Sequence, residues 1–235
     1  MRSNVDFSTG KIAEKLFETQ YKIDVEKKIQ EGAERMLEAF KLSGYQATDK
    51  KLKKETQKNL HYSIAKTALL NNVLNKYNSL KIDDQVVSVE HIGAKGVVSG
   101  TLRIKICQVA DLNLTGISNL RNEGFCIVRV DNIVRGKTKT KSKLIWNEEF
   151  EIKLEKATEL EISFFDKNKH LQGLVFFRLI AISKDPIFVS GSNESFDLEP
   201  RGSLQCFIKF EEQKTPTRRV NGFNISFLCL EDDVL

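Results

Sequence analysis

The sequence predicts an α + β protein with two domains, an antiparallel helical hairpin followed by an antiparallel β-sandwich. Within residues 10–80, apolar residues recur at alternating spacings of about four and three, as in helices that pack along one seam. From residue 99 the apolar period changes to two, which is typical of half-buried strands. We therefore divide the chain into residues 1–88 and 89–235, with a linker over residues 81–98.

The first domain should contain two long helices, because residues 10–80 lack proline and contain glycine only at positions 10, 32 and 44. Gly44 lies in a short break where it suits the left-handed end of a helix, and Thr48 suits the start of the second helix. A glycine inside a helix costs about 1 kcal/mol relative to alanine. We therefore expect Gly32 and Ala33 to mark a close approach of the two helices. The seam of the first helix consists of Val25, Ile29, Gly32, Ala33, Met36 and Phe40.

The second domain should contain seven or more short strands, which predicts an antiparallel sandwich. The alternating residues are Leu102/Ile104/Ile106, Cys126/Val128/Val130, Phe150/Ile152/Leu154, Leu160/Ile162/Phe164, Val175/Phe177/Leu179, Leu204/Cys206/Ile208/Phe210 and Phe223/Ile225/Phe227/Cys229.

Composition excludes several classes of protein. A hydrophobic content of 40% is too high for general disorder, and a net charge of +5 is too small to indicate a nucleic-acid partner. Four isolated cysteines, the absence of a signal-peptide pattern and the absence of a long apolar run favour a cytoplasmic protein. The three histidines have no spaced partners for a metal site or a catalytic triad, so we expect no catalytic residues, metal or cofactor.

A basic run, Arg135–Lys143, precedes the sequence Trp146-Asn147-Glu148-Glu149-Phe150. If this run is extended, Lys137, Lys139 and Lys141 share one face, where they would attract an anion. A phospholipid headgroup is the nearest candidate, with an acidic protein or simple solvation as alternatives. We therefore predict a lipid-binding role for these three lysines.

The sequence Lys28–Leu37, KIQEGAERML, is followed after the break by Asp49-Lys50-Lys51-Leu52. This pattern resembles the homology-region-1 repeat, or REM repeat, of the protein kinase N family and of fungal protein kinase C. The resemblance implies an antiparallel coiled-coil finger that binds Rho-family small GTPases. From their charge at one helix start, we assign GTPase contacts to Lys50, Lys51, Lys53 and Lys54.

Residues 99–212 resemble a C2 domain, in the version found in the protein kinase N family. The match consists of Ser99–Ile104, Val130–Asn132, Gly136–Thr138, Trp146–Phe150, Glu159–Ile162 and Asp197–Leu204. Calcium-binding C2 domains need about five carboxylates in two loops, because Ca²⁺ takes six to eight oxygen ligands. The corresponding loops offer only Asp111 and Asp166, so the resemblance implies a calcium-independent C2 domain. The kinase domain that follows in that family is not found in this sequence.

The two resemblances together predict a signal-transduction regulatory module. In it the hairpin binds an active Rho-family GTPase, while the C2 domain contacts anionic phospholipid at a membrane or docks within the molecule. One alternative is the truncated, autoinhibitory half of a serine/threonine kinase, acting on a kinase domain in cis or in trans. Another is a coiled-coil scaffold without GTPase binding. Neither the GTPase nor the helix face that it contacts follows from the sequence.

Overall fold

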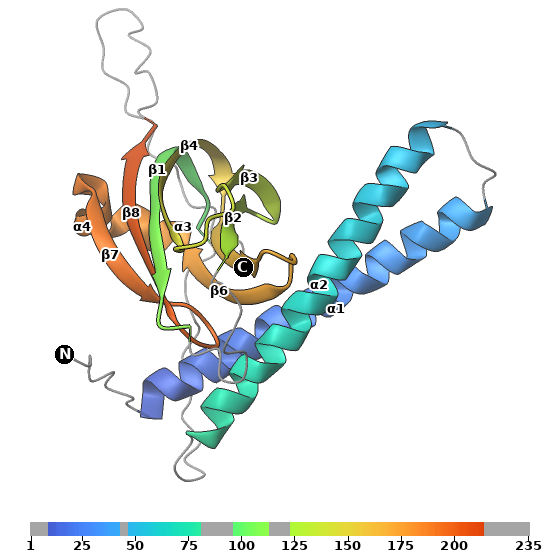
Figure 1. The fold of residues 1–235 in the computed structure, drawn as a ribbon, viewed down its shortest axis with the longest axis horizontal. Helices are drawn as coiled ribbons and strands as arrows, with labels where there is room; N and C mark the ends of the chain where they lie inside the picture. The colour runs from blue at the N-terminus through green and yellow to red at the C-terminus, as the bar shows by residue number, and fades with distance from the viewer. Residues whose placement is uncertain (1–8, 43–46, 81–95, 113–122, 214–235) are drawn as a thin grey trace, which may run out of the picture.

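The computed structural model describes residues 9–42, 47–80, 96–112 and 123–213, which form a helical hairpin and a β-sandwich (Figure 1). Helix α1, Thr9–Leu42, and helix α2, Ala47–Ser79, form an antiparallel hairpin. The predicted break at Gly44, the side chain of Thr48, most of the linker and the strand around Phe223–Cys229 lie outside this description.

In the part of the chain that the structure describes, eight strands form two four-stranded sheets, in which all neighbouring strands are antiparallel. The first sheet has the order β4-β1-β8-β7 and the second the order β3-β2-β5-β6. The strands are β1 Val98–Ala110, β2 Gly124–Val130, β3 Ile133–Lys137, β4 Ile145–Ala157, β5 Glu159–Asp166, β6 Leu171–Arg178, β7 Ser192–Asp197 and β8 Ser203–Glu212. Two short helices, α3 Leu179–Lys184 and α4 Pro186–Ser190, connect β6 to β7. The predicted fold class, a helical hairpin followed by a C2-type sandwich, is confirmed.

The alternating residues of the sandwich form its core, as the period of two predicted. Leu102, Ile104 and Ile162 have no exposed surface, and the indole of Trp146 is only 3% exposed. One detail of the prediction is wrong: Leu179 belongs to the start of α3 rather than to a strand. Its side chain is nevertheless buried in the same core, so the apolar pattern identified a core residue but not its secondary structure.

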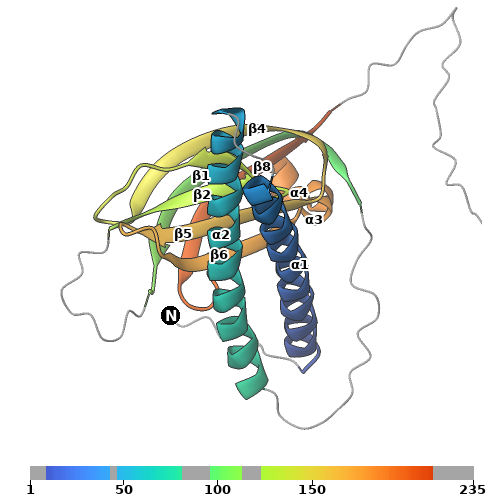
Figure 2. The ribbon, with the colours of Figure 1, turned by 90° about the vertical axis from the view of Figure 1, so that its right-hand side faces the viewer.

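The hairpin lies across the second sheet with part of its length and projects beyond the sheet with the rest (Figures 1 and 2). The sheet is contacted by the N-terminal half of α1 and the C-terminal half of α2, and the end of the hairpin near Leu42 and Ala47 points away. The hairpin therefore has two kinds of surface: the sandwich covers one, and the other is left free.

Candidate functional site

The outer face of the second sheet carries the side chains that meet the hairpin. Along β2 and β5, inward-facing apolar residues alternate with Arg129, Glu161 and Ser163, which point to the opposite face. In an isolated sandwich such polar residues would face water. Here all three are buried, with 7%, 3% and 0% of their surfaces exposed. The central residues of β5 are therefore buried on both faces because the hairpin covers the outer one. We call this contact the hairpin–sheet interface.

Four ionised side chains form the centre of this interface. The ammonium Nζ of Lys66 on α2 lies 2.7 Å from Oε1 of Glu26 on α1 and 2.7 Å from Oε2 of Glu161 on β5. The guanidinium Nη1 of Arg129 lies 3.2 Å from the other oxygen of Glu161. Two positive and two negative charges thus meet in a nearly water-free site. We call these residues the ion cluster.

Hydroxyl groups add hydrogen bonds to the ion cluster, although among the described residues Oε2 of Glu161 has only its ion pair with Lys66. Ser63 donates to Oε2 of Glu26 over 2.5 Å, and Tyr62 donates to Glu161. The Tyr62 oxygen is also 2.8 Å from the Ser163 hydroxyl. The Arg129 guanidinium stacks over the Tyr62 ring, 3.7 Å from its centroid. Most lone pairs of the buried carboxylates therefore have a donor, which is the condition for burying charge without a large penalty.

The electrostatics of the ion cluster keep Glu161 ionised and Lys66 charged. Burial alone would raise the pKa of Glu161, but Lys66 and Arg129 outweigh it and lower that pKa to about 2. Burial alone would lower the pKa of Lys66, and the carboxylates of Glu161 and Glu26 outweigh it and raise the pKa. Burial and the Glu161 charge raise the pKa of Tyr62 well above its usual value. The tyrosine is therefore a neutral hydrogen-bond donor at physiological pH.

Three further ion pairs surround the ion cluster. Lys22 of α1 pairs with Glu159 of β5, and its ammonium lies 3.7 Å from the centroid of the Phe176 ring. Other pairs join Glu18 to Arg178 at 2.6 Å and Lys76 to Glu199 at 2.9 Å. Tyr77 also donates to Glu199. Charges on the hairpin and on the sandwich are therefore complementary along the whole contact.

Apolar packing in the interface comes mainly from the hairpin. Leu174 of β6 is buried within a cluster that otherwise consists of hairpin residues. Its partners on the hairpin are Ile12, Ile23, Leu69, Leu70, Val73 and Tyr77. Leu171 and Phe176 of β6 pack against this cluster while partly exposed.

Sequence reasoning did not identify the hairpin–sheet interface. It placed Glu159 and Glu161 in a strand but not opposite lysines some 100 residues away. The one available signal was composition: a strand that alternates core residues with Glu161, Ser163 and Phe165 has an outer face of mixed character. Such a face indicates that something packs on it but does not identify the partner. Which residues pair across the interface depends on how the two domains dock.

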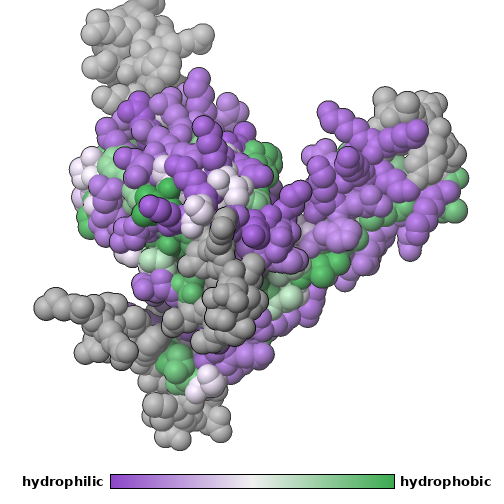
Figure 3. Space-filling view, in the orientation of Figure 1, coloured by the Kyte–Doolittle hydropathy of each residue, from purple (hydrophilic) through white to green (hydrophobic). Residues whose placement is uncertain are grey.

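The lysines predicted to contact a GTPase lie near the start of α2, in the projecting part of the hairpin. Lys50, Lys51 and Lys54 are exposed, whereas Lys53 is half-buried. In Figure 3 the projecting part is largely hydrophilic, with a narrow line of hydrophobic residues along its lower edge. The structure thus brings these lysines together on a surface that the sandwich does not cover.

The packing role predicted for Gly32 is wrong. Gly32 is exposed, and a Cβ atom built on it would meet no other atom within 4 Å. Ala33 beside it is half-buried. The helices are instead tied by polar contacts nearby, including the Gln30 amide, which donates to the hydroxyls of Thr67 at 2.8 Å and Ser63 at 3.2 Å. A glycine in a heptad-like pattern therefore does not by itself locate a close helix contact.

The predicted basic strand is extended only in part. Strand β3 ends at Lys137, and residues 138–140 continue without regular structure to an isolated bridge at Lys141. The side chains of Lys137 and Lys139 are exposed, but the Lys141 ammonium donates to the carbonyl of Trp146 over 3.2 Å. The prediction that three lysines share one strand face is therefore corrected to two exposed lysines and one tied to the backbone.

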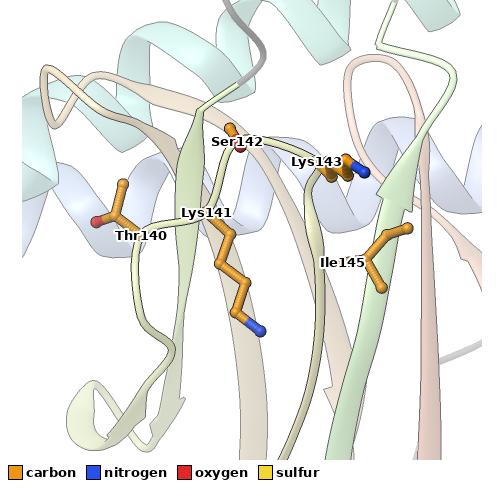
Figure 4. A pocket seen from close by; sticks show the side chains of 5 residues that line it. All are labelled: Thr140, Lys141, Ser142, Lys143 and Ile145. Carbon is orange, nitrogen blue, oxygen red and sulfur yellow. The ribbon is translucent and has the colours of Figure 1, made fainter.

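The second half of this basic loop, which we define as residues 137–143, borders an open hollow of about 520 Å³ (Figure 4). In Figure 4 the side chains of Lys141 and Lys143 extend in different directions. The Lys137 ammonium lies 4.1 Å from the centroid of the Phe125 ring. The hollow is lined by Thr140, Lys141, Ser142, Lys143 and Ile145.

The two candidate calcium-loop carboxylates are engaged within the protein. Asp166 accepts hydrogen bonds from the backbone and ring of His170 and from Gln172. Asp111 accepts one from Ser203. Within the described ranges, no three histidine, cysteine or acidic side chains gather as metal ligands would. None of the helices in these ranges has the length and apolar character of a membrane span.

Comparison with known protein families identifies both domains. Residues 16–85, which include most of the hairpin, match the Hr1 repeat, and residues 100–181, from β1 into α3, match the C2 domain. Among solved structures, a two-domain fragment of Extended-Synaptotagmin 2 is 28% identical with a TM-score of 0.40, covering 55% of this chain and 48% of that one. A C2 domain-containing protein from a putative elicitor-responsive gene is 18% identical with a TM-score of 0.41, covering 53% of this chain and 97% of that one.

Curated relatives match across both domains. The "Protein kinase C-like" protein of Cochliobolus heterostrophus is 28% identical over 181 residues, covering 72% of this chain and 15% of the relative. "Protein kinase C-like 2" of Schizosaccharomyces pombe is 28% identical over 180 residues, covering 72% and 17%. This chain thus spans less than a fifth of the length of these relatives. It consists of an Hr1 repeat followed by a C2 domain, and it is distantly related to the regulatory region of fungal protein kinase C-like proteins.

Proposed function

We propose that this chain is a regulatory module whose Hr1 hairpin binds a Rho-family small GTPase in its GTP-bound state. The observation that carries the proposal is the match of α1 and α2 to the Hr1 repeat. The free position of the projecting end supports it, because Lys50, Lys51 and Lys54 stand exposed there. Clustered cations at an exposed helix start fit an acidic protein surface and would accelerate association.

Calorimetry of the full chain against a panel of Rho-family GTPases, loaded with a GTP analogue or with GDP, tests the proposal. We expect binding in the GTP state to be at least about tenfold tighter, equal to about 1.4 kcal/mol. Equal affinity for both states, or no binding to any member of the panel, would refute it.

A matched pair of variants tests the role of the lysines. The double variant Lys50→Glu/Lys54→Glu should weaken binding, because both side chains stand exposed one helical turn apart. The control Lys153→Glu/Lys156→Glu makes the same charge change on exposed residues of β4, in the sheet away from the hairpin. If the two double variants bind the GTPase with equal affinity, the GTPase contacts other residues of the hairpin.

We further propose that the C2 domain contacts anionic phospholipid through the basic loop and so recruits the chain to membranes. Support comes from the exposed side chains of Lys137 and Lys139 and from the open hollow that Thr140 and the residues after it line in the same loop. In a full-length protein, both domains would regulate a serine/threonine kinase domain, in cis or in trans. The similarity to the regulatory region of protein kinase C-like proteins supports this last step.

A further inference from the structure

The C2 domain presents a row of carboxylates to one face of the hairpin. Glu159, Glu161 and Glu199 each meet a lysine, and the last two also accept from tyrosine hydroxyls. We call the hairpin side of this contact the lysine–tyrosine face. It consists of Lys22, Tyr62, Lys66, Lys76 and Tyr77.

The chemistry of this contact favours reversible docking. Permanent interfaces are more hydrophobic than this one, which has four ionised side chains at its centre. Separation returns those charges to water, so a buried ion pair adds little net stability relative to the separated, solvated partners. The sheet adds apolar side chains around this charged centre: Leu174 is buried in the hairpin cluster, and the ring of Phe165 lies 6.0 Å from that of Tyr62. The charged groups at the centre of both faces would be solvated once the contact opens.

The same chemistry makes the docked state sensitive to single changes. Removing one member of a buried charge pair leaves the other uncompensated and costs several kcal/mol. An acidic side chain placed at Leu174 would be buried among Ile23, Leu70 and Val73 in the docked state but solvated in the open one. Such a change would therefore shift the equilibrium towards opening without altering the sandwich core.

We propose that the C2 domain is a removable cover of the lysine–tyrosine face, and that this face binds an acidic partner surface when it is uncovered. The carboxylate row of the C2 domain occupies the place of that partner in the closed state. The inference rests on the proposed function in one respect, since it identifies the partner as the Rho-family GTPase. It adds that the GTPase contact extends along α2 from Lys54 in the projecting part to Lys66, about 18 Å away at the rise of an α-helix, so that the GTPase and the C2 domain compete for the lysine–tyrosine face.

Two variants on the C2 side open the interface while leaving the hairpin sequence unchanged. Leu174→Glu places a carboxylate in the apolar cluster. Its control, Val189→Glu, adds the same group at an exposed position of α4. Arg178→Glu turns the pair with Glu18 into a repulsion, and adding Glu18→Arg should restore the attraction. Fluorescence of Trp146, the chain's one tryptophan, checks that the sandwich stays folded because this indole lies in its core.

Two measurements on the full chain follow opening and binding separately. Acetylation by a water-soluble amine-reactive ester, read by mass spectrometry, reports the accessibility of Lys66. Lys54 on the same helix is an exposed internal reference. Calorimetry reports affinity for the GTP-loaded GTPase. Both quantities scale with the open fraction of the chain, so a closed-to-open ratio of about 10 predicts a roughly tenfold increase in both on opening.

Leu174→Glu should increase the acetylation rate of Lys66 and the affinity for the GTPase by the same factor, while Val189→Glu should change neither. Arg178→Glu should have a smaller effect of the same kind, reversed by Glu18→Arg. If Leu174→Glu leaves the acetylation rate of Lys66 unchanged, the proposal that the C2 domain is a removable cover is refuted. If Lys66 is acetylated faster but the GTPase does not bind more tightly, the proposed competition is refuted. If no GTPase binds wild type or variant, the proposed function fails, and the Lys66 rates still decide whether the cover opens.

Discussion

Glu161 is the residue on which the hairpin–sheet interface depends most. Its two oxygens receive a lysine from α2, an arginine from β2 and a tyrosine hydroxyl, so it links both domains. Its pKa of about 2 lies below the ordinary value of 4.5 despite complete burial, because the two cations favour the ionised form. Loss of this charge would leave Lys66 with Glu26 alone and Arg129 without an ionised partner in the cluster.

This depressed pKa predicts a loss of stability in acid. A group whose folded pKa is lowered contributes stability above its unfolded pKa of 4.5, and the contribution is lost as pH falls towards about 2. In the docked state a shift of this size corresponds to about 3 kcal/mol, which is an upper limit on the loss in the free energy of unfolding because the hairpin–sheet interface can open instead. Urea unfolding at pH values between 6 and 2.5, on the order of one step per half unit, measures it. Glu161→Gln should be less stable at neutral pH and should lose this part of the pH dependence. A variant with the wild-type profile would show that other carboxylates dominate.

Gly32 offers a second test at the level of one residue. Because an added Cβ meets nothing, Gly32→Ala should raise the free energy of unfolding by roughly 1 kcal/mol through helix propensity alone. Gly136→Ala is the contrasting variant, since its Cβ would lie 2.5 Å from the Phe150 ring and should destabilise the chain. Thermal melts of both variants provide the comparison. A lower melting temperature for Gly32→Ala would support the close helix contact at Gly32 that the sequence predicted.

At the scale of elements, local patterns predicted most of the fold. The heptad-like spacing predicted that α1 and α2 are helices but not the residues that pack between them, since Met36 is 40% exposed whereas Ile23 is buried. The period of two predicted the core strands, because it depends on which side chains face inward. The patterns failed where the chain leaves the regular strand and a backbone carbonyl nearby sets the side-chain direction. Lys141 alternates correctly with Lys137 and Lys139, but its ammonium donates to the Trp146 carbonyl after β3 has ended.

If the basic loop binds lipid as proposed, its three lysines should contribute unequally. Each cation near an anionic surface is worth about 1 kcal/mol, so Lys137→Ala/Lys139→Ala/Lys141→Ala should abolish weak binding to phosphatidylserine vesicles. Lys139→Ala alone should weaken co-sedimentation more than Lys141→Ala, because the Lys141 ammonium is already engaged.

Binding should fall with added salt and should not change with a calcium chelator. The control Lys105→Ala/Lys153→Ala/Lys156→Ala removes three lysines from β1 and β4, in the other sheet, and should sediment as wild type does. If the basic-loop triple variant co-sediments as much as wild type does, these lysines are solvated and do not bind lipid. Release by the chelator would show that Asp111 and Asp166 are part of a calcium site.

At the scale of the whole molecule, the order of the two domains was predictable but their docking was not. Each motif reports on the packing of its own domain, whereas docking depends on charges that are ordinary surface residues until the domains meet. Lys22 and Lys76 have no distinctive position in the helix pattern. Their role emerges only from the glutamates opposite them on the sandwich.

The projecting hairpin also has a mechanical consequence. Glu26 lies in the ion cluster, and the remaining residues of α1 to Leu42 extend about 24 Å beyond it at the rise of an α-helix. A helix held near its middle is a lever, so a tilt of about 10° at the cluster would move the far end by roughly 4 Å. A small shift of the buried charges that tilts the hairpin would thus move Lys50 and Lys54 by several ångströms.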